Sequence, residues 1–395
     1  MLWFVSSLEK KGGGERFVLE GSNAIRSHGH DVRIVCDRLN DAASFDGRYD
    51  LTGVLCTAQD YDPKAGYLSR TFSKIGGLLA LYRVVRNERP DLVICQSEFD
   101  TIKLFVLSKL MRVKYRTFVF GQMFQFKSDI SKYSSVFRRH LETVVSSRPG
   151  YRDTVMMPPP RLAAPVRLVN EAVSRLKRRA LRSADRVFAV SNQVKWEVSL
   201  LYGRDAHVCR AAFDESYIDT RTISAPRPVA EPVRFVSVCR LTEKKRVDLT
   251  IRAFSTATVP ALLTIIGCGP EEARLHELAA AGERADSIRF LGAVSDEELQ
   301  AELAVADCFI SMDIADYNIS VVEAMGKGLR VLVASDFDLS EFGSDFTGVR
   351  SVEPEESALS RAMDSLETMA PPSATNLTVL RRLTWQHMAG ECVAP

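Results

Sequence analysis

The sequence predicts an α/β protein built from two similar halves, each with a parallel β-sheet covered by helices. Short apolar runs alternate with stretches of helical spacing along most of the chain, which is typical of repeated strand–helix–strand units. A stretch with several prolines and little periodicity, residues 220–232, interrupts the alternation, which then restarts. With 395 residues, the chain is long enough for two domains with separate cores.

The composition is that of an ordinary water-soluble protein, with 46% hydrophobic and 26% charged residues. A net charge of +2 gives no overall field that would attract nucleic acid, so we expect no nucleic-acid partner. The eight cysteines are scattered without a CxxC pair, which favours buried thiols in a reducing compartment. No run reaches the ~20 apolar residues that cross a bilayer, and the N-terminus lacks the basic segment of a signal peptide.

The first half opens with an apolar strand followed by three consecutive glycines, Gly12, Gly13 and Gly14. Helical spacing follows over residues 15–28, and a second apolar run, residues 31–36, completes a strand–helix–strand unit. Glycines at the start of a helix let backbone N–H groups approach a ligand closely, and a helix start favours a phosphate. The spacing matches neither GxGxxG nor a P-loop, and a tight turn without a ligand is the alternative.

Residues 125–182 break the alternation and are strongly basic. Aromatic and apolar side chains lie between the charges, and three consecutive prolines, residues 158–160, mark an irregular loop. A basic, partly amphipathic stretch of this kind can lie on an anionic membrane surface or contact an anionic acceptor. The alternative is a charged helix face exposed to water. The basic residues are Lys127, Lys132, Arg138, Arg139, Arg148, Arg152, Arg161, Arg167, Arg175, Lys177, Arg178, Arg179 and Arg182.

The first strand expected in the second half, residues 233–239, leads into a loop with two cations, Arg240 and Lys245. Fixed cations beside the N–H groups of a helix start form a site for a diphosphate. Such cations also stabilise the charge of a phosphate that leaves during a reaction. Taken alone, the same pattern is common in loops that are simply exposed to water.

Three further strand ends of the second half carry features that suit a nucleotide. Gly267 and Gly269 form a glycine turn after the next strand, which permits close approach of a backbone. Leu291 lies at the end of the following strand, and Glu323 lies in the helix after an apolar strand at 308–310. Because ligands bind at the carboxyl ends of strands in open α/β sheets, we expect phosphate, base and ribose contacts at these ends.

Together these motifs resemble those of the GT-B glycosyltransferases of retaining family 4. The matching segments follow the family's order over nearly the whole chain and are GGGERFVLEGSNAIRSHGHDV, SADRVFAVS, CRLTEKKRVDLTIRAF, LLTIIGCGPE, IRFLGAVSDEEL, ISVVEAMGKG and LTWQHMAGE. The resemblance implies two Rossmann-like domains facing a cleft, with the C-terminal helix crossing back to the N-terminal domain. The pattern of residues 377–393 predicts that this tail is one amphipathic helix.

The expected parts are an acceptor-side domain at 1–215, a linker at 216–232, a nucleotide-sugar domain at 233–372 and the returning helix at 373–395. By resemblance, glycines and cations bind the donor phosphates, and Glu323 binds the ribose. The expected phosphate-binding residues are Gly12, Gly13, Gly14, Arg240 and Lys245, and those around the nucleotide are Gly267, Gly269, Leu291 and Glu323.

The sequence departs from the family where the donor sugar is expected to bind. The first Glu of the family's Glu-x7-Glu pair would fall at Ala315, and the adjacent Asp316 is our candidate substitute. We expect Asp316 and the second acid, Glu323, to be the catalytic carboxylates. The donor-sugar residues expected from the resemblance are Asp316, Tyr317, Asn318 and Ile319.

A second departure lies on the acceptor side. The family often has a histidine at the end of the strand expected at 115–120, and here Gly121 and Gln122 follow that strand. A departing phosphate that accepts the proton of the incoming hydroxyl would make this histidine unnecessary. The six histidines show no HxxH or HExxH spacing, so we expect no metal and no other cofactor.

The sequence therefore predicts a retaining glycosyltransferase of polysaccharide biosynthesis. It would move a hexose from a nucleotide diphosphate sugar to a hydroxyl of a saccharide or lipid-linked acceptor, by metal-independent front-face transfer. We expect it in the cytoplasm, with peripheral contact to the inner face of the membrane through residues 125–182. The alternative from another class is a degenerate, non-catalytic member that binds nucleotide-sugar or glycan and acts with a partner. A nucleotide-sugar epimerase is less favoured, because no clear set of acid and base residues is present.

Overall fold

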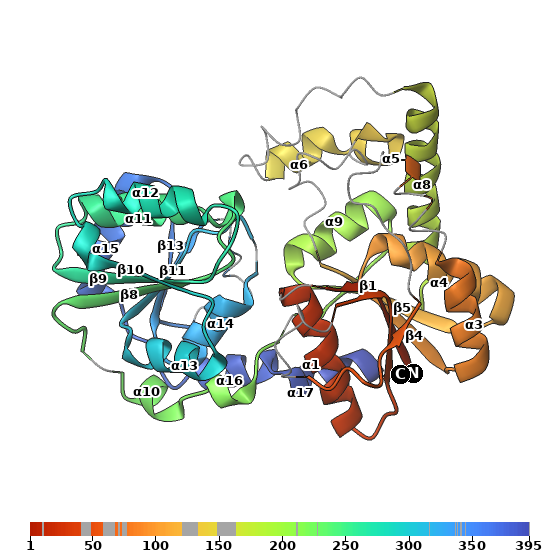
Figure 1. The fold of residues 1–395 in the computed structure, drawn as a ribbon, viewed down its shortest axis with the longest axis horizontal. Helices are drawn as coiled ribbons and strands as arrows, with labels where there is room; N and C mark the ends of the chain where they lie inside the picture. Colours follow the sequence, from red (N-terminus) through yellow and green to blue (C-terminus); the bar gives the residue numbers. More distant parts are fainter. Residues whose placement is uncertain are drawn as a thin grey trace. The chain divides into compact units, whose positions relative to one another are not determined.

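The chain forms two compact units in the computed structural model (Figure 1). Unit 1 comprises residues 1–210 and 388–395, and unit 2 comprises residues 211–387. The residues that the structure describes are 1–9, 12–40, 49–57, 68–69, 72, 77–120, 133–147, 163–210, 212–226, 228–315, 317–335, 337, 339, 342–343 and 345–394.

Unit 1 contains a seven-stranded parallel sheet with the strand order β3-β2-β1-β4-β5-β6-β7. The order starts at a central strand and winds outward in both directions, as in Rossmann-like domains. The strands are β1 (Leu2–Leu8), β2 (Arg33–Leu39), β3 (Leu55–Cys56), β4 (Leu92–Cys95), β5 (Lys114–Val119), β6 (Arg186–Ala189) and β7 (His207–Val208). The helices are α1 (Gly13–Ser27), α3 (Leu78–Glu88), α4 (Glu98–Met111), α5 (Ser135–Arg138), α6 (Leu141–Ser147), α8 (Ala164–Ser183) and α9 (Asn192–Tyr202).

An aromatic cluster packs α1 against the sheet of unit 1. Trp3 on β1 stacks on Phe118 of β5 with ring centroids 5.9 Å apart, and Phe17 of α1 meets both rings edge to face. All three side chains are fully buried. Large buried rings in edge-to-face contact stabilise a fold by more than the burial of their surface area alone would. The cluster therefore holds α1, and with it the glycines at its start, against the sheet.

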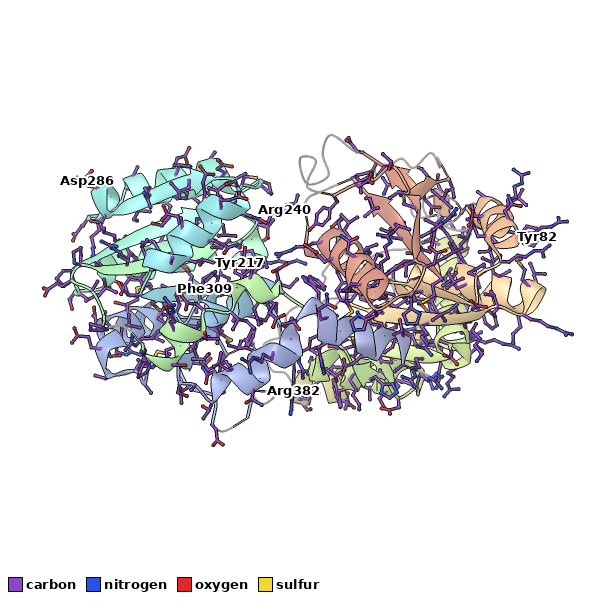
Figure 2. The ribbon with its side chains drawn as sticks, turned by 90° about the horizontal axis from the view of Figure 1, so that it is seen from below. Tyr82, Tyr217, Arg240, Asp286, Phe309 and Arg382 are labelled. Carbon is purple, nitrogen blue, oxygen red and sulfur yellow. The ribbon has the colours of Figure 1, made fainter. Side chains whose placement is uncertain are left out.

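Unit 2 contains a six-stranded parallel sheet with the order β10-β9-β8-β11-β12-β13. Neighbouring residues of β8 point into different cores on its two faces, with Phe235 in one and Val236 in the other. Phe309 and Tyr217, labelled in Figure 2, belong to the same core as Val236. The strands are β8 (Val233–Val238), β9 (Ala261–Ile266), β10 (Ile288–Gly292), β11 (Cys308–Ser311), β12 (Arg330–Ala334) and β13 (Val349–Val352). The helices are α10 (Thr220–Ser224), α11 (Val247–Thr256), α12 (Glu272–Ala280), α13 (Asp296–Val305), α14 (Ile319–Gly326), α15 (Glu356–Asp364) and α16 (Asn376–Leu380).

Part of the stretch expected to link the domains is helical. Asp219 accepts hydrogen bonds from the backbone N–H groups of Arg221 and Thr222 and so caps the start of α10. Ile223 of this helix is fully buried in the core of unit 2. No helix among the residues described in either unit is both long and apolar enough to cross a membrane.

The chain returns to unit 1 at its C-terminus, as predicted from the resemblance. The last helix is α17 (Trp385–Val393), and residues 388–395 belong to unit 1. Arg116 on β5 donates from Nη1 to the main-chain oxygens of Cys392 and Ala394, at 2.7 and 2.8 Å. Its Nε donates to Asp185 at 2.9 Å. Hydrogen bonds from a charged donor of this kind are stronger than neutral ones and hold the tail against β5.

The prediction of one continuous helix over residues 377–393 was wrong. A 3₁₀ turn at Arg381–Leu383 and an extended residue, Thr384, separate α16 from α17. The backbone of Phe213 lies beside this break, donating to the oxygen of Leu383 at 3.0 Å and accepting from the N–H of Trp385 at 3.3 Å. The helix is interrupted because the Trp385 N–H bonds to Phe213 instead of to the preceding turn, and the Leu383 oxygen bonds to Phe213 instead of to the following turn.

Candidate functional site

The carboxyl ends of four adjacent strands bring most of the predicted site residues of unit 2 to one edge of the sheet. Strands β10, β9, β8 and β11 lie side by side and run parallel, so the loops that follow them are neighbours. Arg240 and Lys245 follow β8, Gly267 follows β9, Leu291 lies near the end of β10, and Asn318 follows β11. This is the edge where open α/β sheets bind ligands.

Main-chain hydrogen bonds join the loops at this edge. The loop after β8 thereby continues the parallel pairing with β9 beyond the ends of both strands. Because each bond uses backbone atoms, the joined loops form a rigid base for the side chains that they carry. The bonds run from Cys239 N to Ile266 O (3.0 Å), from Leu241 N to Cys268 O (3.0 Å) and from Gly267 N to Gly292 O (2.7 Å).

Two of the predicted glycines are required by this close backbone contact. A Cβ at Gly267 would lie 1.9 Å from the oxygen of Cys239, and one at Gly269 would lie 2.2 Å from the oxygen of Leu241. Gly267 also has a backbone φ of 124°, a value that residues other than glycine rarely adopt. The sequence suggested room for a ligand, and the structure identifies a second reason for both glycines, namely contact with the loop after β8.

The two cations after β8 lie in different surroundings. Arg240 is exposed at the edge of unit 2 (Figure 2). Lys245 ends a short 3₁₀ helix, Glu243–Lys245, and its Nζ donates to Oδ2 of Asp313 in the loop after β11. The side chain of Asp313 is 7% exposed, compared with 26% for Lys245. One predicted phosphate ligand is therefore open to solvent, and the other is held by a buried carboxylate.

Burial also sets the titration of the groups around Lys245. The pKa of the Cys239 thiol is raised to about 12, mainly because the thiol is buried; Lys245 lowers this pKa and the charge of Asp313 raises it, both by less than burial does. Cys239 is thus a neutral thiol at ordinary pH rather than a nucleophile. Burial lowers the pKa of the Lys244 ammonium, against the raising effect of Asp313.

The start of α14 contains the predicted donor-sugar residues. The side-chain oxygen of Asn318 accepts from the N–H of Ser320 at 3.0 Å and so caps the helix that begins at Ile319. Tyr317 stacks on Phe337 with ring centroids 6.4 Å apart. Glu323 lies in the second turn of the same helix and is 3% exposed.

The glycines predicted to face phosphate in unit 1 lie at the start of α1. Gly12 is the residue before the helix, and it contributes no side-chain cap to the first-turn N–H groups. Gly14 lies beside Gln96, which follows β4, since a Cβ there would be 3.8 Å from the Gln96 amide nitrogen. Glu15 of the first turn also lies at this helix start, since a Cβ at Gly12 would be 2.5 Å from its Oε2.

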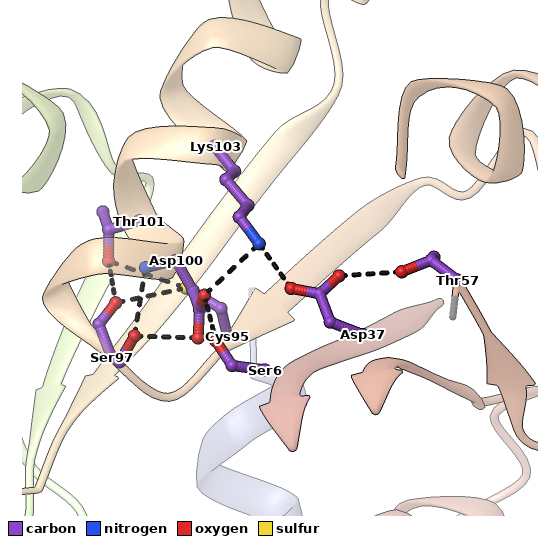
Figure 3. A network of polar contacts seen from close by, with 8 residues as sticks. All are labelled: Ser6, Asp37, Thr57, Cys95, Ser97, Asp100, Thr101 and Lys103. Carbon is purple, nitrogen blue, oxygen red and sulfur yellow. Dashed lines mark hydrogen bonds and ion pairs between the residues drawn. The ribbon is translucent and has the colours of Figure 1, made fainter. Parts of the chain in front are cut away.

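A buried polar network joins the ends of β1, β2 and β4 in unit 1 (Figure 3). Lys103 Nζ lies 2.6 Å from Oδ2 of Asp37 and 4.0 Å from Oδ1 of Asp100. Ser6 on β1 donates to Asp100 at 2.6 Å, and Ser97 before α4 donates to its other oxygen at 2.8 Å. Burial raises the pKa of the Asp100 carboxyl, whereas Lys103 lowers it. Through these bonds the network holds the strand end that leads to the glycines.

Three predicted site residues lie outside the described part of the chain. They are Asp316, Gly121 and Gln122, so the candidate substitute acid and the acceptor-side residues stay predictions. Of the basic stretch, residues 133–147 and 163–182 are described. Within the described residues no group of three or more His, Cys, Asp or Glu side chains is placed to hold a metal ion.

Two family descriptions match the chain, one for each unit. Glycosyltransferase Family 4 matches residues 11–214, which is more than half of the chain, and Glycosyl transferases group 1 matches residues 220–378. The chain belongs to glycosyltransferase family 4. The matches confirm the family and the GT-B fold that the sequence motifs predicted.

Curated members of the family are similar over part of their length. The chain is 33% identical over 121 residues to the amylovoran biosynthesis glycosyltransferase AmsK of Erwinia amylovora. It is 30% identical over 135 residues to the putative colanic acid biosynthesis glycosyltransferase WcaL of Escherichia coli K12. These matches cover 28% and 32% of this chain and 30% and 32% of the relatives, so they span less than a third of each relative.

Solved structures match over nearly the whole chain. HepE from Anabaena in complex with UDP has a TM-score of 0.68 and 14% identity, with 99% of this chain and 97% of that chain covered. Sucrose-phosphate synthase from Thermosynechococcus elongatus has a TM-score of 0.71 and 13% identity, with 99% and 96% covered. WaaG, a glycosyltransferase involved in lipopolysaccharide biosynthesis, has a TM-score of 0.64 and 12% identity, with both chains fully covered. At these identities the likeness shows the fold alone.

Sequence reasoning missed the role of Asp313 in this site. In the sequence Asp313 is one of several acidic and polar residues that follow the apolar run at 308–310. A signal was present, since an acid in the loop that follows a buried strand lies at the edge where ligands bind. What could not be read was its contact with Lys245, because the two residues are far apart in sequence.

The glycine contacts predict unequal effects of two similar substitutions. Gly267→Ala should lower the free energy of unfolding by about 3 kcal/mol, because the new Cβ would collide with Cys239 and the backbone conformation is unfavourable for alanine. Gly292→Ala is the matched control, since its φ is also positive, at 65°, but nothing lies within 4 Å of the new Cβ. There we expect a loss of about 1 kcal/mol. Urea unfolding followed by circular dichroism measures both, and equal losses would contradict the contact.

Proposed function

We propose that this family 4 protein is a retaining glycosyltransferase that moves a hexose from a nucleotide diphosphate sugar to a hydroxyl group. The observation that carries the proposal is the edge of unit 2, where Arg240 and Lys245 stand on joined strand-end loops beside the start of α14. The acceptor would be a saccharide or a lipid-linked saccharide. AmsK and WcaL, which are named for polysaccharide biosynthesis, support this choice of acceptor.

The chemistry proposed for this edge is stabilisation of a leaving nucleoside diphosphate. As the bond between sugar and phosphate breaks, negative charge grows on the phosphate oxygens, and fixed cations at hydrogen-bond distance lower the barrier. Arg240 offers a planar fork of donors, and Lys245 offers the ammonium protons that Asp313 leaves free. Gly12, Gly13 and Gly14 at the start of α1 stay predicted phosphate ligands, through backbone N–H groups of the helix start.

Front-face transfer needs no separate base in this scheme. The departing phosphate oxygen takes the proton of the incoming hydroxyl, and that hydroxyl attacks from the side on which the diphosphate leaves. The configuration at the anomeric carbon is therefore retained. We assign Glu323 to the ribose, Gly267, Gly269 and Leu291 to the nucleotide, and Asp316, Tyr317, Asn318 and Ile319 to the sugar.

We also propose that transfer proceeds without a metal ion. Arg240 and Lys245 would supply positive charge where other transferases use a divalent ion. A second candidate function is a degenerate member that binds nucleotide-sugar without transferring it, and Ala315 in the place of the first family acid favours it. One assay distinguishes an active transferase from this non-catalytic member and also tests metal independence.

The assay measures transfer from labelled UDP-, GDP- and ADP-sugars to a panel of saccharide and lipid-linked acceptors. We expect transfer with one donor class, unchanged by EDTA and with the anomeric configuration retained. Arg240→Ala with Lys245→Ala should abolish transfer and weaken nucleoside diphosphate binding at least 100-fold, since two charge-assisted contacts are lost.

Arg381→Ala with Arg382→Ala is the matched control, because it removes two exposed charges elsewhere on unit 2; Arg382 is labelled in Figure 2. Calorimetry should find its affinity for the nucleoside diphosphate unchanged. If the native protein binds a donor but neither transfers the sugar nor slowly hydrolyses the donor, the protein is a degenerate, non-catalytic member. Unchanged affinity of the first variant would refute the phosphate site, and loss of transfer on EDTA treatment would refute metal independence.

The described part of the basic stretch supports a proposed contact with an anionic membrane surface. Helix α8 exposes Arg167, Arg175 and Arg179 together with Leu168, which is 72% exposed. Lys177, by contrast, is buried with its Nζ 4.1 Å from the ring centroid of Phe99, so it does not belong to this surface. Exposed arginines beside an exposed leucine suit lipid headgroups and the adjoining acyl boundary.

Vesicle sedimentation tests this contact. The protein should bind vesicles of anionic phospholipid at low salt and dissociate as salt is raised. Replacing Arg167, Arg175 and Arg179 by Gln should weaken binding about 100-fold, since each arginine near an anionic surface contributes about 1 kcal/mol. Replacing Arg252, Arg381 and Arg382 of unit 2 by Gln is the control. Equal binding to neutral vesicles would contradict the proposal.

A further inference from the structure

Asp313 is the acidic partner of Lys245 and lies in the loop after β11, following Met312. Its Oδ2 accepts from Lys245 Nζ and lies 3.4 Å from the amide nitrogen of Asn318. Asn318 also caps α14 through its side-chain oxygen. One buried carboxylate therefore contacts a proposed phosphate ligand and a proposed sugar ligand at the same time.

The backbone around this carboxylate is fixed. Ile314 N donates to the oxygen of Lys244 at 3.1 Å, and Arg246 donates from Nη1 to the oxygen of Met312 at 3.4 Å. The loop after β11 and the loop after β8 are thus joined on both sides of the contact between Asp313 and Lys245. These bonds hold the backbone on both sides of Asp313 close to the loop that carries Lys245, and the Asp313 side chain, 7% exposed, lies buried beside the ammonium.

A lysine ammonium has three donors, and Asp313 occupies one of them. Two donors remain for a phosphate, so a diphosphate and Asp313 can bind Lys245 together. The carboxylate nevertheless neutralises the charge of Lys245 and repels an anion that binds next to it. Asp313 therefore helps to place the ammonium while it opposes tight binding of a diphosphate.

The repulsion differs between the donor and the product of the proposed reaction. In a nucleotide diphosphate sugar each phosphate carries one negative charge, because the terminal phosphate is esterified by the sugar. After transfer this phosphate is free, and its second ionisation near pH 6 adds a further charge. A carboxylate fixed beside Lys245 consequently repels the product more strongly than the donor.

We propose that Asp313 is a positioning residue that weakens binding of the nucleoside diphosphate product relative to the donor and so promotes product release. The proposal rests on the proposed function, because it requires a diphosphate at Lys245. It assigns to Asp313 an effect on affinity that is opposite in sign to that of Lys245 and Arg240.

The test compares Asp313→Asn with the native protein by calorimetry at pH 8. The asparagine oxygen still accepts from Lys245, so the position of the ammonium is kept while the charge is lost. We expect the Kd of the nucleoside diphosphate to fall about tenfold and that of the corresponding nucleotide sugar to fall about threefold. In the transfer assay, inhibition by added product should become about tenfold stronger. Asp313→Ser, which also removes the charge, should shift both constants in the same direction.

Glu302→Gln is the matched control. Glu302 pairs with Arg289 at 2.6 Å in the same unit, so this change also converts a paired carboxylate to an amide. Both Kd values should stay unchanged there. The inference would be overturned if both Asp313 variants bound the product as tightly as the native protein or more weakly. It would also be overturned if the Kd values of donor and product changed by the same factor. Either result would leave the proposed function standing. Absence of binding of UDP, GDP and ADP to the native protein would overturn the proposed function and this inference with it.

Discussion

Main-chain hydrogen bonds between the loops after β8 and β9 are the constraint on which the site of unit 2 depends. They bring the backbone at Gly267 and Gly269 so close to Cys239 and Leu241 that no side chain fits between them. Arg240 lies between the two latter residues and is therefore presented by a part of the backbone that is bonded on both sides. The backbone position from which its cation reaches toward a growing negative charge is therefore fixed, although the side chain itself is exposed.

Charge balance is the second property of this edge. Two cations alone would bind a nucleoside diphosphate tightly, and a transferase must release that product in every cycle. The buried carboxylate of Asp313 partly neutralises one of these two cations, Lys245. Its contact with Asn318 extends the same arrangement to the start of α14, where the sugar is proposed to bind. Placement of the phosphate, release of the product and selection of the sugar would thus depend on one short segment after β11.

Much of the fold follows from the sequence, because alternation of apolar strands and amphipathic helices is a local pattern. The returning tail followed from the family resemblance, but its break at Thr384 did not, since the break is caused by the backbone of Phe213, 171 positions away. Arg240 and Lys245 could be placed after β8 from sequence. The partner of Lys245 could not, because nothing in the local pattern fixes how the loops after β8 and β11 meet.

The central claim is that the joined strand-end loops of unit 2 bind the nucleoside diphosphate. Hydrogen–deuterium exchange of the full chain, with and without the nucleoside diphosphate that binds, tests it most directly. The account predicts slower exchange in residues 239–246, 267–271 and 311–318, with no change in helix α15 of the same unit. Protection confined to other segments, or no protection by a ligand that calorimetry shows to be bound, would contradict it.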